Sequence, residues 1–107
     1  MTIIINLTPH TINATRRDGS VRAIAPSGSV ARCSQSSVEV GEVEGIPLYR
    51  TTFGEVTGLP APEEGVLYIV SALVRMAVPH RADVVSPGEL LRGPDGQPVG
   101  CKGLAVS

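Results

Sequence analysis

The chain has 107 residues, of which 42% are hydrophobic, 18% are charged and 3% are aromatic. This composition is typical of one globular domain and argues against an intrinsically disordered chain. A net charge of −1 and the scarcity of aromatic rings also argue against a dedicated nucleic-acid-binding protein, which needs a basic surface and rings for base stacking. The twelve glycines and nine prolines predict frequent turns between short elements.

The first third of the chain predicts short strands. Residues 2–7 predict a first strand, and the continuous apolarity of the β-branched run at residues 2–5 predicts that it is buried on both faces. Residues 11–15 and 21–25 flank an Asp-Gly pair, which favours a hairpin turn. A short strand is expected at residues 30–33, and the polar residues 34–37 predict a loop.

The central region predicts a second hairpin. Residues 38–43 and 46–53 are rich in β-branched and aromatic side chains, and Glu44-Gly45 between them predicts the turn. Residues 54–64 contain several Gly and Pro residues, so we expect a loop there.

A strongly apolar run at residues 65–70 predicts the next strand. Ser71 suits the N-cap of a short helix at about residues 71–78, because a serine hydroxyl can accept a free N–H of the first turn. Pro79 predicts the end of this helix, since proline has no N–H and does not fit inside a helix.

The last third predicts strands again. Residues 83–86 predict a short strand ended by Pro87-Gly88, and residues 90–92 and 99–102 predict a third hairpin. Residues 104–106 extend the last strand. This strand is a plausible sheet edge, and exposed edges invite pairing, so we expect a homodimer or a higher homo-oligomer.

The order of elements predicts one α+β domain over residues 1–107, with a mostly antiparallel β-sheet, several short hairpins and one short helix. The N-terminus lacks the basic region of a signal peptide, and we expect a soluble cytoplasmic protein with no membrane partner. Cys33 and Cys101 lie far apart and lack metal-site spacing. They predict two buried, reduced thiols, although spacing alone does not exclude a disulfide.

The first candidate ligand-binding cluster lies where the first strand ends. Asn6 and Thr8 offer amide, carbonyl and hydroxyl groups, and His10 adds an imidazole that can donate, accept or transfer a proton. The alternative is structural: Asn6 and Thr8 satisfy the backbone of a turn, and His10 begins the next strand.

Two further clusters offer ligand groups. Arg50 and Phe53 on one strand combine a cation with an aromatic platform suited to a purine or a ribose; alternatively, Phe53 anchors the loop that follows. Ser71 places the N–H groups of a helix at the end of a strand, where anions bind; the alternative is an ordinary N-cap. Arg92 can clamp a phosphate or form a surface salt bridge with Asp95.

Catalytic motifs are incomplete. His80 and Asp83 could act as a base and its orienting carboxylate, or could be solvated loop charges. No metal-ligand spacing or paired-carboxylate motif occurs in the sequence, so we expect neither a metal nor a cofactor.

The opening Asn6-Leu7-Thr8-Pro9-His10 resembles the start of a family of small proteins from phages and high-GC bacteria. The resemblance extends to later segments, at residues 43–47, 53–60, 68–74 and 92–100. The family brings no established active site. It implies a phage or prophage setting, and small phage proteins outside the virion are often counter-defence factors.

Together these features predict a phage-type counter-defence protein, active in the host cytoplasm, that binds and sequesters a nucleotide-derived signalling molecule without turnover. The residues expected to bind this small nucleotide-like ligand are Asn6, Thr8, His10, Arg50, Phe53, Ser71 and Arg92. One alternative is a small hydrolase or nuclease with His10 or His80 as its base. Another is an inhibitor that binds a host defence enzyme through an exposed sheet edge.

Overall fold

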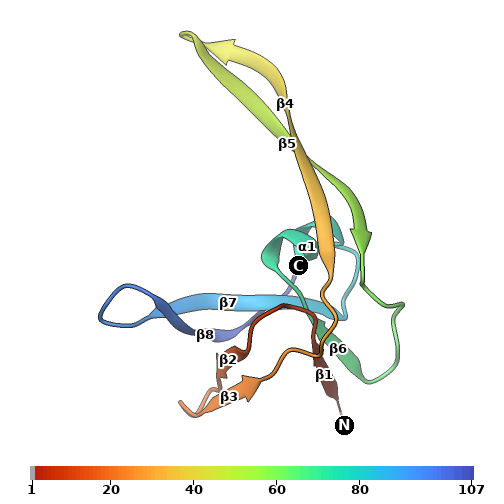
Figure 1. Cartoon of the computed structure of the whole chain (residues 1–107), viewed down its shortest axis with the longest axis vertical. Coiled ribbons are helices and arrows are strands. Elements are labelled where there is room, and N and C mark those ends of the chain that lie inside the picture. The colour runs from red at the N-terminus through yellow and green to blue at the C-terminus, as the bar shows by residue number, and fades with distance from the viewer. Residues whose placement is uncertain (1) are drawn as a thin grey trace.

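The computed structural model describes residues 2–107. Most of this part of the chain is β-strand, with one short helix between the sixth and seventh strands (Figure 1). In chain order the elements are β1 (Ile3–Asn6), β2 (Ile12–Thr15), β3 (Val21–Ile24), β4 (Arg32–Val43), β5 (Ile46–Thr57), β6 (Val66–Ile69), α1 (Ala72–Ala77), β7 (Val84–Arg92) and β8 (Pro98–Ala105).

Six strands form one mixed sheet in the order β1-β6-β7-β8-β2-β3. The pairs β1–β6, β6–β7 and β2–β8 are parallel, whereas β7–β8 and β2–β3 are antiparallel. The expected α+β class with its short helix is therefore observed, but the sheet is less antiparallel than predicted. Helix α1 explains why β6 and β7 are parallel, because it carries the chain from the end of β6 back to the end of the sheet where β7 starts.

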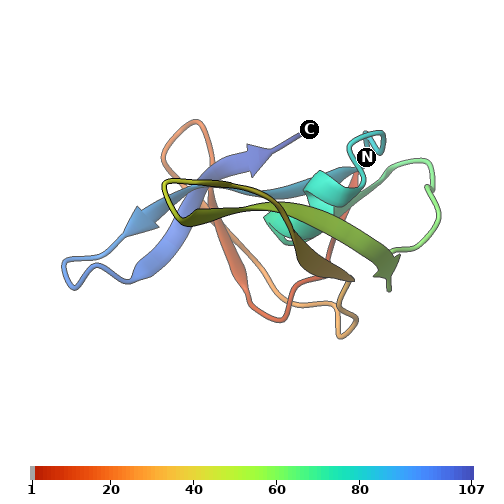
Figure 2. The same ribbon diagram turned by 90° about the horizontal axis from the view of Figure 1, so that it is seen from above.

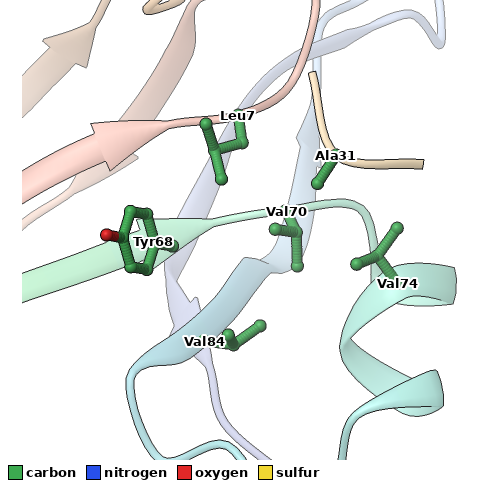
Figure 3. Close-up of a cluster of buried hydrophobic side chains, with 6 residues drawn as sticks. All are labelled: Leu7, Ala31, Tyr68, Val70, Val74 and Val84. Carbon is green, nitrogen blue, oxygen red and sulfur yellow. The ribbon is translucent and has the colours of Figure 1, made fainter. Parts of the chain in front are cut away.

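The core lies on both faces of the strands β1, β6 and β7. Tyr68 of β6 and Val70, the residue directly after this strand, belong to a buried cluster that also includes Val74 of helix α1 (Figure 3). The intervening Ile69 faces the other way and packs with Ile24 and Val85. This alternation follows from the two-residue period of a strand, so a continuously apolar segment can be buried on both sides.

The sheet is nearly closed into a barrel, with β1 and β3 as its two end strands. The prediction for the first strand holds in part: Ile4 and Ile5 pack against opposite clusters, but Ile3 is 57% exposed because β1 has a single neighbour. The prediction that the last strand forms an edge is wrong. Strand β8 lies between β7 and β2, and Cys101 on it is buried.

Strands β4 and β5 form a separate two-stranded arm that extends away from the barrel (Figure 1). The turn at Glu44-Gly45 is confirmed, and both residues have positive φ, at 52° and 79°, as a tight hairpin turn requires. The arm makes the molecule 51 Å long, and its radius of gyration is 16.3 Å. A compact domain of this length would have a radius of about 13 Å.

The arm is longer than its sequence predicted. The polar residues 34–37 lie inside β4, and the first four residues of the expected loop at 54–64 belong to β5. The predicted strand at residues 30–33 begins only at Arg32. Both faces of the arm contact solvent, so these strands need no alternation of polar and apolar side chains, which is the pattern that reveals a strand in a sequence.

The hairpin of β7 and β8 also projects from the barrel, and it points to the same side in both views (Figures 1 and 2). Its predicted turn is confirmed, but Pro87-Gly88 does not end the strand. Strand β7 pairs with β6 only at Val84 and Val85, so the edge that faced β6 is free from there onward and tolerates a proline. The hairpin of β2 and β3 is confirmed as predicted.

Candidate functional site

Asn6, the first predicted site residue, joins the two end strands of the barrel. Its side-chain amide donates hydrogen bonds to the carbonyl of Ile24 on β3 (2.9 Å) and to the carbonyl of His10 (2.8 Å). Its side-chain oxygen accepts from the N–H of Thr8 (2.9 Å) and from the Thr8 hydroxyl (2.6 Å). Asn6 is 1% exposed, and these four bonds use the full capacity of its amide group.

The backbone of Asn6 makes further hydrogen bonds that hold the two end strands of the barrel together. Its carbonyl accepts hydrogen bonds from the N–H and the hydroxyl of Ser27, at 2.9 and 2.7 Å. The next residue, Leu7, accepts from the N–H of Ala31 at 3.0 Å. The Asn-Leu-Thr-Pro-His segment therefore ties the end of β1 to β3 and to the chain leading into the arm. The structural interpretation of Asn6 thus accounts for its side-chain amide and for its backbone carbonyl.

A hollow lies where this segment, helix α1 and the start of the arm meet. We call it the arm-base hollow; its volume is about 230 Å³. It brings together two predicted site residues, Thr8 and Ser71, which are far apart in sequence. The residues that line it are Leu7, Thr8, Pro9, Val30, Ala31, Arg32, Cys33, Ser71, Leu73 and Val74.

Ser71 is the N-cap of helix α1, as predicted. Its hydroxyl oxygen accepts a hydrogen bond from the N–H of Val74 at 3.3 Å, and its carbonyl accepts from the N–H of Arg75 at 3.0 Å. The helix has only six residues. One of the N–H groups that the sequence suggested for anion binding is therefore satisfied by the cap itself.

Two residues of the arm-base hollow were missed by sequence reasoning, Arg32 and Cys33. Both stand at the start of β4, and Arg32 is exposed. Within residues 2–107 the Arg32 guanidinium enters no ion pair, so its charge remains available at the hollow. The sequence offered one signal, an isolated cation directly after an apolar stretch. That signal is common on protein surfaces and specifies no site.

The remaining predicted residues lie elsewhere. His10 is exposed and lines a different hollow, of about 310 Å³, between β2 and the β7–β8 hairpin, so it does not line the arm-base hollow with Thr8 and Ser71. Arg50 and Phe53 stand on β5 in the arm, where Phe53 is 42% exposed. Arg92 donates to the carbonyl of Gly96 at 2.9 Å, in the turn of the β7–β8 hairpin.

The proposed pairing of His80 with Asp83 is replaced by an ion pair. The Arg81 guanidinium donates to both carboxylate oxygens of Asp83, at 2.7 and 2.8 Å, and also to the carbonyl of Pro60 at 3.0 Å. These hydrogen bonds from Arg81 lower the pKa of Asp83 below its usual value. The Asp83 carboxylate fixes the position of Arg81, and Arg81 holds the loop before β6 through its hydrogen bond to the Pro60 carbonyl.

Among residues 2–107, no helix has the length and hydrophobicity needed to cross a lipid bilayer. No three His, Cys, Asp or Glu side chains in this range come together as a metal site. Comparisons of the chain with protein-family models, with curated proteins and with solved structures found no significant match.

Proposed function

We propose that the protein binds a small nucleotide-like ligand in the arm-base hollow and sequesters it without turnover. The observation that carries this proposal is that an arginine, a serine and several apolar residues line one hollow. Arg32 supplies the cation, Ser71 the hydroxyl, and Leu7, Ala31 and Val74 belong to the apolar floor.

The chemistry of these groups suits a phosphorylated sugar with a base. A guanidinium can hold two oxygens of a phosphate with paired hydrogen bonds. The Ser71 oxygen accepts from Val74, which leaves its own proton free to donate to the ligand. The apolar floor offers a surface for a ring. A volume of about 230 Å³ is below the range of roughly 300–1,000 Å³ for drug-sized pockets, so the hollow would enclose part of one nucleotide unit and leave the rest of the ligand outside.

Binding without turnover is favoured over hydrolysis by the residues around the hollow. The described residues that line it include no histidine, aspartate or glutamate, so a bound ligand would meet no general base of these types. Thr8 lies there, but its hydroxyl proton is directed to Asn6 at 2.6 Å. The counter-defence role itself is supported by the resemblance of the Asn-Leu-Thr-Pro-His opening to phage proteins.

Calorimetry against a panel of cyclic mononucleotides, cyclic dinucleotides and cyclic ADP-ribose tests the proposal. We expect one member to bind at micromolar levels or better, and Arg32→Ala to weaken it by about tenfold, equivalent to about 1.4 kcal/mol. Arg50→Ala is the matched control, because Arg50 is also an exposed arginine of the arm. A loss caused by Arg50→Ala alone would move the site to the arm, and no binding to any member would overturn the proposal.

The two cysteines provide a second readout. Cys33 lines the hollow and is half-buried, whereas Cys101 on β8 is buried, and both thiols are free. A ligand in the hollow should slow the reaction of Cys33 with a thiol reagent, while Cys101 reacts only on unfolding with or without ligand. Chromatography of the released ligand distinguishes sequestration, which returns it intact, from hydrolysis, which returns products.

A further inference from the structure

The arm of β4 and β5 exposes a large apolar surface. Among residues 2–107, seven of the fourteen large hydrophobic side chains that are exposed lie on it, including Ile46 at 61% and Tyr49 at 62%. A single two-stranded hairpin is marginally stable in water, and monomeric proteins rarely expose apolar patches larger than a few hundred Å². The arm therefore has the character of a surface that another protein covers.

The outer end of the arm is also acidic, which restricts what can cover it. We call this end the arm tip, residues 38–50. It carries the carboxylates of Glu39, Glu42 and Glu44 and one guanidinium, Arg50. The strand register places Glu39 opposite Tyr49, on one face of the hairpin. A surface that covers the arm tip must therefore combine apolar groups with positive charge.

A hollow with these properties lies on the barrel. We call it the basic hollow; its volume is about 680 Å³, and it lies between the β2–β3 turn and the β7–β8 hairpin. Three cations line it, Arg16, Arg17 and Lys102, together with the exposed side chain of Leu91 and small residues. Its charge and its apolar component are thus complementary to those of the arm tip.

Two carboxylates near the basic hollow reduce its positive charge only in part. The Asp18 carboxylate is held by its own turn, where it accepts from the hydroxyl and the N–H of Ser20, at 2.6 and 2.9 Å. Glu89 stands opposite Lys102 in the β7–β8 ladder. Arg16 and Arg17 remain as the cations that a partner would meet at the β2–β3 turn.

We propose that the arm tip of one copy of this chain docks into the basic hollow of a second copy. A copy cannot fill its own hollow, because the arm extends along the longest axis of the molecule and leads away from the β2–β3 turn (Figure 1). Direct packing of one arm on another would instead bring three carboxylates of each copy together, which like-charge repulsion opposes. In a reciprocal dimer or in a closed ring, every arm tip occupies the basic hollow of another copy.

Charge reversal on the two surfaces tests this contact by light scattering and native mass spectrometry. One variant carries Glu39→Lys and Glu42→Lys on the arm tip; the other carries Arg16→Glu and Arg17→Glu at the basic hollow. All four residues are exposed, and circular dichroism verifies that both variants are folded. We expect the unmodified chain to be oligomeric and each variant alone to dissociate, with an apparent Kd raised at least about tenfold.

An equimolar mixture of the two variants separates this contact from other modes of assembly. Each reversed arm tip then meets a reversed hollow, and each native arm tip meets a native hollow, so we expect assembly to return. If the arms packed on each other, the variant changed only at Arg16 and Arg17 would remain oligomeric by itself. That result, or a monomeric unmodified chain, would overturn the proposal.

The position of the contact can be read directly, because Lys102 is the only lysine of the chain. A zero-length carbodiimide reagent joins a lysine to a carboxylate that it touches. In a mixture of ¹⁴N and ¹⁵N chains, we expect mixed-isotope peptides that join Lys102 to Glu39, Glu42 or Glu44. Cross-links confined to Glu89, its neighbour in the same chain, would contradict docking of the arm tip in the basic hollow.

Discussion

Replacement of Asn6 by aspartate should destabilise the barrel far more than its small change in shape suggests. Aspartate keeps the oxygen that accepts from Thr8, but it replaces the amide nitrogen by a second oxygen. That oxygen would face the carbonyls of Ile24 and His10, to which the amide donates at 2.9 and 2.8 Å. Since the side chain is 1% exposed, water cannot compensate for the lost bonds.

The magnitude follows from these contacts. Leaving a buried polar group without its partner costs about 1–3 kcal/mol, and burial of an unpaired carboxylate adds to this. We expect Asn6→Asp to lower the free energy of unfolding by about 3–5 kcal/mol at pH 7. A typical domain is stable by about 5–15 kcal/mol, so the variant would lose between about a fifth and all of its stability.

The loss should depend on pH, with a definite sign. Burial and the two facing carbonyls raise the pKa of the new carboxyl in the folded state above its unfolded value of about 3.9. Between these two pKa values the folded state binds more protons than the unfolded state. The variant therefore gains stability relative to the unmodified protein as the pH falls, by up to about 1.4 kcal/mol per pH unit.

Urea unfolding followed by circular dichroism, at several pH values from neutral to acidic, measures both effects. Asn13→Asp is the matched control, because Asn13 is half-buried on β2 and does not belong to the hydrogen bonds that join β1 to β3. It should change stability by much less and show no comparable gain at low pH. Equal stabilities of the two variants, or an Asn6→Asp variant that loses stability on acidification relative to the unmodified protein, would refute the role assigned to Asn6.

The other predictions concern an ion pair and a close approach of strands. Asp83→Asn should lower the free energy of unfolding by about 1–2 kcal/mol near neutral pH, because it removes the charged partner of Arg81. The lowered pKa of Asp83 means that the ion pair stabilises the protein above about pH 4 and that this stabilisation is lost below it. The unfolding curves of the variant and of the unmodified protein should therefore converge in acid. Gly88→Ala should lower the thermal midpoint by several degrees, because its new methyl group would overlap the carbonyl of Lys102. Gly41→Ala, whose methyl group would make an ordinary contact at 3.9 Å, should leave the midpoint nearly unchanged, and equal effects of the two alanines would contradict this account.

Local patterns in the sequence determined much of the secondary structure. The three hairpin turns were predictable because each contains a glycine, Gly19, Gly45 or Gly96, that adopts positive φ where most residues cannot. Helix α1 was predictable because Ser71 caps its start and Pro79 lies directly beyond its end. These signals act within a few residues, so they need no knowledge of the rest of the chain.

The arm and the order of the strands were decided by tertiary structure. Strands β4 and β5 escape detection over part of their length because both of their faces contact solvent and impose no hydrophobic pattern. The position of β8 inside the sheet depends on its pairing with β2, which precedes it by more than eighty residues. No local signal specifies a pairing across such a distance.

The candidate site shows the same division. The sequence identified Asn6, Thr8 and Ser71 as residues at the ends of strands, because polar groups directly after apolar runs are conspicuous. It could not show that all four side-chain hydrogen bonds of Asn6 are made within the barrel. Nor could it show that Arg32 and Ser71 line the same hollow. Those relations arise only when β1, β3 and the base of the arm converge, since hydrogen bonds and hollows between distant segments exist only in the folded chain.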